Sequence, residues 1–209
     1  MSGRFIVLDG IDGCGKSTQM DHLATWLPAS GLIPPGARLI RTREPGGTSL
    51  GGGVRELLLH TAAEAAPAPT AELLLYAADR AQHVETLIRP ALIRGDWVIS
   101  DRFSGSTMAY QGYGRGLDRS LIRELERIAT GGLSPDVTVL LDLPLKESIR
   151  RRRGDQDDRI EAEGELFLQR VQEGFRQLAL ERRWSRVKAD CPIAEVSDAL
   201  ERSLRELLM

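Results

Sequence analysis

The sequence is poor in cysteine. It has two, Cys14 and Cys191, far apart and without a CxxC pair. Disulfide scaffolds and zinc sites both need more cysteines at closer spacing, so neither class of protein is indicated. This cysteine usage favours a reducing compartment.

Long hydrophobic runs are also absent. No apolar segment approaches the roughly 20 residues that span a bilayer. The first residues lead directly into a strand-like apolar segment, without the basic, apolar and small-residue zones of a signal peptide. The sequence therefore predicts a soluble cytoplasmic protein with no membrane partner.

Neither sign of charge is in excess. The 209 residues include 28 Lys plus Arg and 30 Asp plus Glu, a formal net charge of -2. This balance argues against a mainly electrostatic nucleic-acid binder. A chain of this length is typical of one α/β domain, and we expect a single domain over residues 1–209.

Short apolar runs alternate with helical periodicity along the whole chain. The predicted strands are 5–8, 38–42, 97–100, 137–141 and 186–189. Helical stripes lie between them, and the stripe 74–88 is expected to pack inward; Asp118 is a predicted N-cap and Gly131 a predicted helix end. Apolar strands separated by helices predict an α/β fold with a parallel sheet covered on both faces.

Residues 10–17 read GIDGCGKS and match the phosphate-loop motif G-x-x-x-x-G-K-[ST] between a predicted strand and a predicted helix. The backbone N-H groups of such a loop surround phosphate oxygens, and the N-terminus of the next helix favours the same anion. Lys16 is expected to reach the β and γ phosphates, and the Ser17 hydroxyl to bind Mg²⁺. The predicted ATP-binding residues are Gly10, Ile11, Asp12, Gly13, Cys14, Gly15, Lys16, Ser17 and Thr18.

The chain contains no asparagine. A GTP switch reads guanine with an N-K-x-D motif, so this class is very poorly supported, and kinases and other ATP-using proteins remain. Cys14 is expected to be a small filler within the loop and not a nucleophile.

The segment 99–111, ISDRFSGSTMAYQ, begins at the carboxyl edge of a predicted strand. Ligands bind at this edge of open α/β sheets. Asp101 is therefore a candidate for the Mg²⁺ shell, and Arg102 a candidate ligand of a phosphate group.

Together with the segments 42–48 (TREPGGT), 74–82 (LLYAADRAQ) and 158–161 (DRIE), these motifs closely resemble those of the thymidylate kinases of the bacterial type. The resemblance covers essentially the whole chain. It implies a P-loop kinase fold with a five-stranded parallel sheet, and a homodimer. It also implies transfer of the γ-phosphoryl group from ATP with Mg²⁺ to dTMP, giving dTDP and ADP in dTTP synthesis.

The same resemblance implies roles for individual residues. Arg43 and Arg102 correspond to ligands of the acceptor phosphate, and Asp12 to a carboxylate near it and the 3'-hydroxyl. The residues around the nucleoside are Tyr76 stacking on thymine, Arg80 donating to a base carbonyl, Ser106, Thr107 and Gln111 along the base edge, and Tyr110 crowding the ribose 2' position. Independently, Tyr76 and Arg80 are four residues apart and share a helix face, a spacing that also fits a core-edge aromatic ring beside a solvated charge.

A catalytic arginine is expected in a lid at about residues 150–160. Some family members carry this arginine in the phosphate loop, but Gly13 occupies that place here. Successive helical residues turn by about 100°, so the run 150–153 cannot all face one phosphate chain. By family position Arg153 is favoured, with Arg151 second and Arg159 as a further candidate.

Two alternatives stay open. One is a related kinase for a nucleoside or a different monophosphate. The other is a non-catalytic ATP-binding switch, which would show no dependence on an acceptor.

Overall fold

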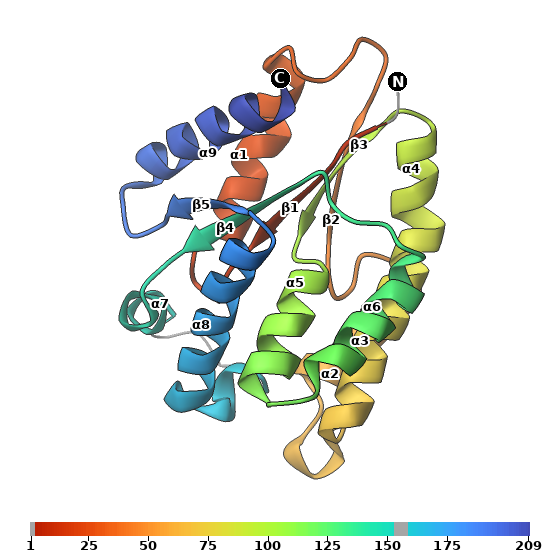
Figure 1. Ribbon diagram of the computed structural model, residues 1–209, viewed down its shortest axis with the longest axis vertical. Coiled ribbons are helices and arrows are strands. Elements are labelled where there is room, and N and C mark those ends of the chain that lie inside the picture. The colour runs from red at the N-terminus through yellow and green to blue at the C-terminus, as the bar shows by residue number, and fades with distance from the viewer. Residues whose placement is uncertain (1–2, 153–158) are drawn as a thin grey trace.

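The computed structural model describes residues 3–152 and 159–209 (Figure 1). One sheet of five parallel strands runs through its centre in the order β2-β3-β1-β4-β5. The strands are β1 (Phe5–Asp9), β2 (Leu39–Arg43), β3 (Trp97–Asp101), β4 (Val137–Asp142) and β5 (Ser185–Lys188). The predicted five-stranded parallel sheet of an α/β fold is therefore confirmed.

Helices cover both faces of this sheet. They are α1 (Lys16–Ala29), α2 (Ser49–Leu59), α3 (Pro69–His83), α4 (Arg89–Ile93), α5 (Ser104–Thr107), α6 (Arg119–Thr130), α7 (Leu145–Arg151), α8 (Glu165–Glu181) and α9 (Ile193–Leu208). Two π-helical segments, η2 (Val84–Ile88) and η3 (Met108–Gly114), continue α3 and α5, and short 3-10 turns are η1 (Ala63–Ala65) and η4 (Glu161–Glu163).

The alternation of side chains along β1 explains the two-sided packing. Ile6 and Leu8 pack with Met20 and Leu23 of α1, whereas Phe5 belongs to a second apolar cluster with η2 and α4. Helix α9 lies beside α1 in Figure 1 and packs on β4 and β5. A strand that is buried on both faces reads as a continuous apolar run, as β1 does.

Three strands bring their carboxyl ends together. In the sheet register Arg43 pairs with Asp101, and Asp101 pairs with Leu8, one residue before the end of β1. The loop 10–15 and the start of α1 follow β1 directly. Residues far apart in the sequence therefore meet at the edge where open α/β sheets bind their ligands.

The prediction that the stripe 74–88 packs inward is wrong for its first part. Leu74 is half exposed, and α3 instead buries Leu73 with polar residues, Glu72, Asp79, Arg80 and His83. The apolar stripe could not reveal this face because its inward side chains are mostly charged. The predicted ends of α6 are confirmed: the Asp118 carboxylate accepts from the Ser120 N-H at 2.7 Å, and Gly131 is left-handed at the C-cap.

Candidate active site

The phosphate loop joins β1 to α1, as predicted. The Lys16 ammonium folds back over this loop and donates to the carbonyl oxygens of Gly10 at 3.2 Å and Ile11 at 3.1 Å. Its side chain is almost fully buried. The cation is therefore held in the loop, beside the first backbone N-H groups of α1.

A cavity opens over this loop, and we call it the loop cavity. Its lining residues are Asp12, Gly13, Gly15, Lys16, Ser17, Thr18, Arg43, Glu44, Arg55, Asp101, Arg102 and Arg151. Six of the nine predicted ATP-binding residues are among them. The other three lie behind the surface: Ile11 and Cys14 are buried, and the Gly10 carbonyl accepts from Lys16.

Cys14 behaves as a packing residue. Its side chain is buried, and this burial raises the pKa of the thiol. A thiol with a raised pKa is a poor nucleophile near neutral pH. The geometry agrees with the predicted role as a small filler in the loop.

Gly13 has a backbone that other residues rarely adopt. Its φ is 73°, and a Cβ atom there would lie 3.1 Å from the Ser148 carbonyl oxygen and 3.2 Å from Cγ of Arg152. A side chain at this position would be both strained and crowded. An arginine at position 13 would therefore need a strained backbone and a small shift of its neighbours.

Ser17 and Asp101 line the same cavity, which is the arrangement predicted for Mg²⁺. The Oδ1 atom of Asp101 is buried and has no hydrogen-bond partner among the residues that the structure describes. Over those same residues there is no cluster of three or more His, Cys, Asp and Glu that could hold a metal. One carboxylate and one hydroxyl fit Mg²⁺ that is shared with substrate phosphates.

Arg102 joins the phosphate loop to the segment after β3. Its Nη1 donates to the Gly10 carbonyl at 2.9 Å and to Ser106 Oγ at 2.8 Å, and its Nη2 donates to Asp12 Oδ1 at 2.5 Å. The Tyr110 hydroxyl donates to the other Asp12 oxygen at 2.7 Å. Arg102 also has φ of 70°, and a left-handed arginine is the kind of backbone outlier found at functional sites.

These contacts set the charges of two carboxyl groups. Burial alone would raise the pKa of Asp12, but the charges of Arg102 and Lys16 outweigh it and hold this pKa well below its usual range. Asp9 is fully buried, and this burial raises its pKa from 3.8 to about 6 despite the nearby Arg102 charge. The two carboxyl groups therefore differ strongly in acidity.

A second cavity adjoins the first and lies against α3, and we call it the α3 cavity. Its lining residues are Asp12, Glu44, Pro45, Arg55, Leu59, Tyr76, Arg80, Arg102, Phe103, Ser106, Thr107, Tyr110, Gln111 and Ile160. Eight of the nine predicted substrate residues line it. The ninth, Arg43, lines the loop cavity instead.

Arg80 projects into the α3 cavity from α3, one turn after Tyr76. Its Nε donates to Glu44 Oε2 at 2.9 Å, and its Nη2 donates to Thr107 Oγ1 at 2.9 Å. The guanidinium lies over the Phe103 ring, 5.3 Å from its centroid. Arg80 is only 2% exposed, so this cation is fixed within the cavity wall.

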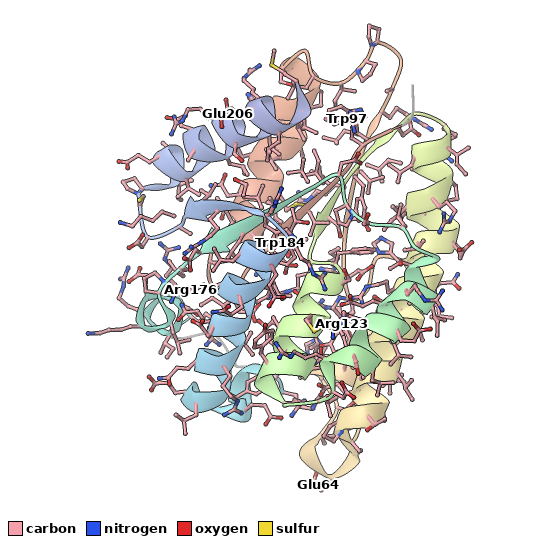
Figure 2. The ribbon with its side chains drawn as sticks, in the orientation of Figure 1. Glu64, Trp97, Arg123, Arg176, Trp184 and Glu206 are labelled. Carbon is pink, nitrogen blue, oxygen red and sulfur yellow. The ribbon has the colours of Figure 1, made fainter. Side chains whose placement is uncertain are left out.

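Close packing fixes the start of α5, which carries Ser106 and Thr107. The Trp184 indole, labelled in Figure 2, reaches Gly105 so closely that no Cβ would fit there. The wide turns of η3 then place Tyr110 and Gln111 on the same cavity. Helix α8 packs along η3 and supports it from behind.

Several residues of the site escaped the sequence analysis. Glu44 lies in the segment 42–48, but no role was predicted for it. In the structure it pairs with both Arg80 and His83. Glu72 lies one helical turn before Tyr76, which is a signal that could have placed it on the same face. Arg55 lines both cavities and donates to the Pro45 carbonyl at 3.0 Å, but no motif marked it.

Two arginines of the run 150–153 lie in the last turn of α7. Arg151 lines the loop cavity, and its Nη1 lies 3.4 Å from the Gly13 carbonyl oxygen. Arg150 and Arg151 both pair with Glu147, at 2.6 Å and 3.1 Å, and Arg151 Nη2 also donates to the Ala189 carbonyl at 2.9 Å. Arg153, the favoured catalytic candidate, lies outside the described residues.

Arg159 follows the undescribed stretch on the side of the α3 cavity. It pairs with Glu72, and its Nε donates to the Leu58 carbonyl at 2.8 Å. Of the arginines considered for the lid, the described part of the chain brings Arg151 to the phosphate loop and holds Arg159 elsewhere.

Comparisons with known proteins agree with this geometry. The thymidylate kinase family model matches residues 8–200. The chain is 74% identical to a thymidylate kinase of Parasynechococcus marenigrum (strain WH8102) and 69% identical to one of Synechococcus sp. (strain CC9605), each over the full length of both chains. The crystal structure of thymidylate kinase from Ehrlichia chaffeensis superposes with a TM-score of 0.76 at 33% identity, over 98% of this chain and 99% of that one. The chain therefore belongs to the thymidylate kinase family.

Proposed function

We propose that the two cavities divide the substrates of an ATP-dependent dTMP kinase between them. The loop cavity would take the phosphates of ATP, and the α3 cavity would take dTMP. The wall that the two cavities share supports this division. It is formed by four residues that line both cavities, Asp12, Glu44, Arg55 and Arg102. The γ-phosphoryl group and the acceptor phosphate would meet at this wall and yield dTDP for dTTP synthesis.

On the donor side, the backbone N-H groups of the loop and the start of α1 would bind the phosphates. Lys16 would move from its loop carbonyls to the β and γ phosphates. Ser17 and Asp101 would hold Mg²⁺, which, when bound, neutralises charge on the phosphate oxygens.

On the acceptor side, the Tyr76 ring would stack on thymine and Arg80 would donate to a base carbonyl. Ser106, Thr107 and Gln111 would lie along the base edge. Tyr110 is fixed by its hydrogen bond to Asp12, which suits a residue that crowds the ribose 2' position. Arg43 and Arg102 would bind the acceptor phosphate.

Catalysis would depend on positioned cations. The transition state of phosphoryl transfer spreads negative charge over the moving group, and the protein has little covalent work to do. Lys16, Arg102 and Arg151 line the cavity where this charge would develop. Arg153 stays a candidate for the same role.

We also propose a homodimer in the cytoplasm. Helices α2, α3 and α6 lie side by side in Figure 1, and they expose Leu57, Leu74, Leu121 and Ile128. Exposed apolar side chains on neighbouring helices are typical of a surface that another chain covers.

Both cysteines are free thiols, which suits a reducing compartment. No helix among the described residues is long and apolar enough to cross a membrane.

Coupled ADP release with a panel of monophosphates tests the proposed division. With ATP and Mg²⁺, ADP should form rapidly with dTMP and slowly with dCMP, dAMP or dGMP. Preference for another monophosphate would favour a related kinase, and release that ignores the acceptor would favour an ATP-binding switch. Sedimentation of the wild-type chain beside Leu74→Asp tests the homodimer.

A further inference from the structure

Gln111 reaches the α3 cavity from η3 with only one end of its amide available. Its Nε2 donates to Glu72 Oε1 at 2.8 Å, and both side chains are almost completely buried. Gln111 lines the cavity, and its contact with Glu72 does not use the amide oxygen, Oε1, which is the acceptor that the amide can offer to a bound molecule. The cavity therefore presents a hydrogen-bond acceptor at this point.

The chemistry of Glu72 allows only one orientation of the Gln111 amide. An ionised carboxylate can only accept hydrogen bonds, whereas an amide both donates and accepts. Burial would raise the pKa of Glu72, but hydrogen bonds from Arg115, Arg159 and Gln111 outweigh it and lower this pKa. The carboxylate stays ionised near neutral pH, so Gln111 must turn its NH₂ group toward it.

Arg115 and Arg159 hold the Glu72 carboxylate in place. Arg115 Nε lies 2.6 Å from Oε1 and its Nη2 lies 2.8 Å from Oε2, a two-pronged contact. Arg159 also donates to Oε2. Two guanidinium groups hold this carboxylate in one position, and the fixed carboxylate in turn orients the amide of Gln111.

Arg80 supplies the complementary donor in the same cavity. Two of its five N-H groups donate to Glu44 and Thr107, which leaves N-H groups on Nη1 and Nη2 as donors for a ligand. An acceptor beside a donor matches the N3-H and carbonyl edge of thymine or uracil. Cytosine has an acceptor at N3 and an amino group beside it. Its N3 would therefore face the acceptor of Gln111, and its amino group would face the donor of Arg80.

We propose that Glu72 is a positioning residue that sets base specificity. It would fix the acceptor end of Gln111 toward the base and so favour pyrimidines that carry N3-H over cytosine. This inference rests on the proposed placement of dTMP in the α3 cavity. Glu72 itself would not touch the substrate.

Glu72→Gln tests this role because a glutamine at 72 can donate to Gln111 and allow its amide to rotate. Mismatched hydrogen bonds in a closed site cost large factors in affinity, and the ratio of the dCMP and dTMP dissociation constants should fall by about tenfold or more. The dissociation constant of ATP should change by less than about twofold, since the change lies outside the loop cavity.

The exchange variant Glu72→Gln with Gln111→Glu restores a carboxylate next to an amide, with an acceptor again facing the base. Its dCMP to dTMP ratio should return toward the wild-type value. Glu163→Gln is the matched control, since Glu163 also pairs with Arg115, at 2.8 Å, and should leave the ratio unchanged. If Glu72→Gln does not fold, the ratio measured for the exchange variant tests the proposal by itself.

An unchanged ratio in folded Glu72→Gln, or no recovery in the exchange variant, would overturn the positioning role. Gln111→Leu separates this failure from a failure of the proposed function. If Gln111→Leu leaves dTMP binding and the ratio unchanged, the base does not lie against Gln111. If it lowers the ratio while Glu72→Gln does not, only the role of Glu72 is wrong.

Discussion

The guanidinium of Arg102 and the carboxylate of Asp12 form an ion pair of 2.5 Å across the wall shared by the two cavities. Arg102 comes from the end of β3, and Asp12 from the phosphate loop after β1. The same guanidinium also binds the Gly10 carbonyl. A phosphate group entering the α3 cavity would therefore meet a cation whose position is already fixed by the loop that binds the donor.

Arg102→Lys should lower kcat/KM for dTMP by about 10- to 100-fold, because a lysine keeps the charge but loses the planar fork. Steady-state kinetics with dTMP varied at saturating ATP measure this effect. Arg127→Lys is the control, an exposed arginine on α6 that pairs with Glu124. A loss no larger than that of the control would show that the fork is not used.

The sequence was sufficient for the sheet, the phosphate loop and most of the residues that meet in the two cavities. Periodicity and a motif between a strand and a helix are local signals, and family motifs supplied the rest. Glu44 and Glu72 were missed because their partners, Arg80, Arg115 and Arg159, are 36 to 87 residues away. The inward face of α3 carries buried charged side chains, so the spacing of apolar residues could not identify this face.

The position of Arg151 over the phosphate loop leads to a kinetic prediction. Arg151→Ala should lower kcat by about tenfold or more with little change in either KM, because a cation used mainly in the transition state contributes little to ground-state binding. Arg150→Ala is the control, since both arginines pair with Glu147 but only Arg151 lines the loop cavity. Arg153→Ala should be measured beside them.

If Arg151→Ala, Arg153→Ala and their double variant all keep kcat within about threefold of the wild type, neither arginine serves the transition state. In that case Lys16 and Arg102, with Arg159 or a cation from another subunit, would have to supply the charge.

Asp9 should make the protein without substrates less stable as the pH rises. Burial raises its pKa to about 6 from 3.8, so the folded state binds the proton more tightly than the unfolded state. The stability present below pH 3.8 is lost as the pH rises through about 6, and the full loss is about 3 kcal/mol. Asp9→Asn should therefore gain in free energy of unfolding, relative to wild type, between pH 4 and pH 8.

Urea unfolding of both proteins across this range measures the difference. Glu124→Gln provides a control of opposite sign, because the hydrogen bond from Arg127 lowers the pKa of exposed Glu124. This variant should lose stability relative to wild type as the pH rises toward about 4.5, and the difference should stay level above that pH. A relative stability of Asp9→Asn that stays flat with pH would mean that burial does not raise the pKa of Asp9.

Lys16→Ala should lower kcat by about 100-fold or more, since the ammonium is expected at the β and γ phosphates. The fold should persist because the Nζ contacts lie within the loop itself. Circular dichroism and coupled ADP release separate these effects. Near-normal turnover with an intact spectrum would contradict the proposed donor site.

The most direct test of the division between the two cavities is calorimetric titration of Arg80→Ala with dTMP and with ATP. Arg80 lines only the α3 cavity of the two, held there by Glu44 and Thr107. The dissociation constant of dTMP should rise by about tenfold or more, as expected for the loss of a buried hydrogen bond from a charged group, while that of ATP stays within about twofold. Equal weakening of both substrates would contradict separate sites for donor and acceptor.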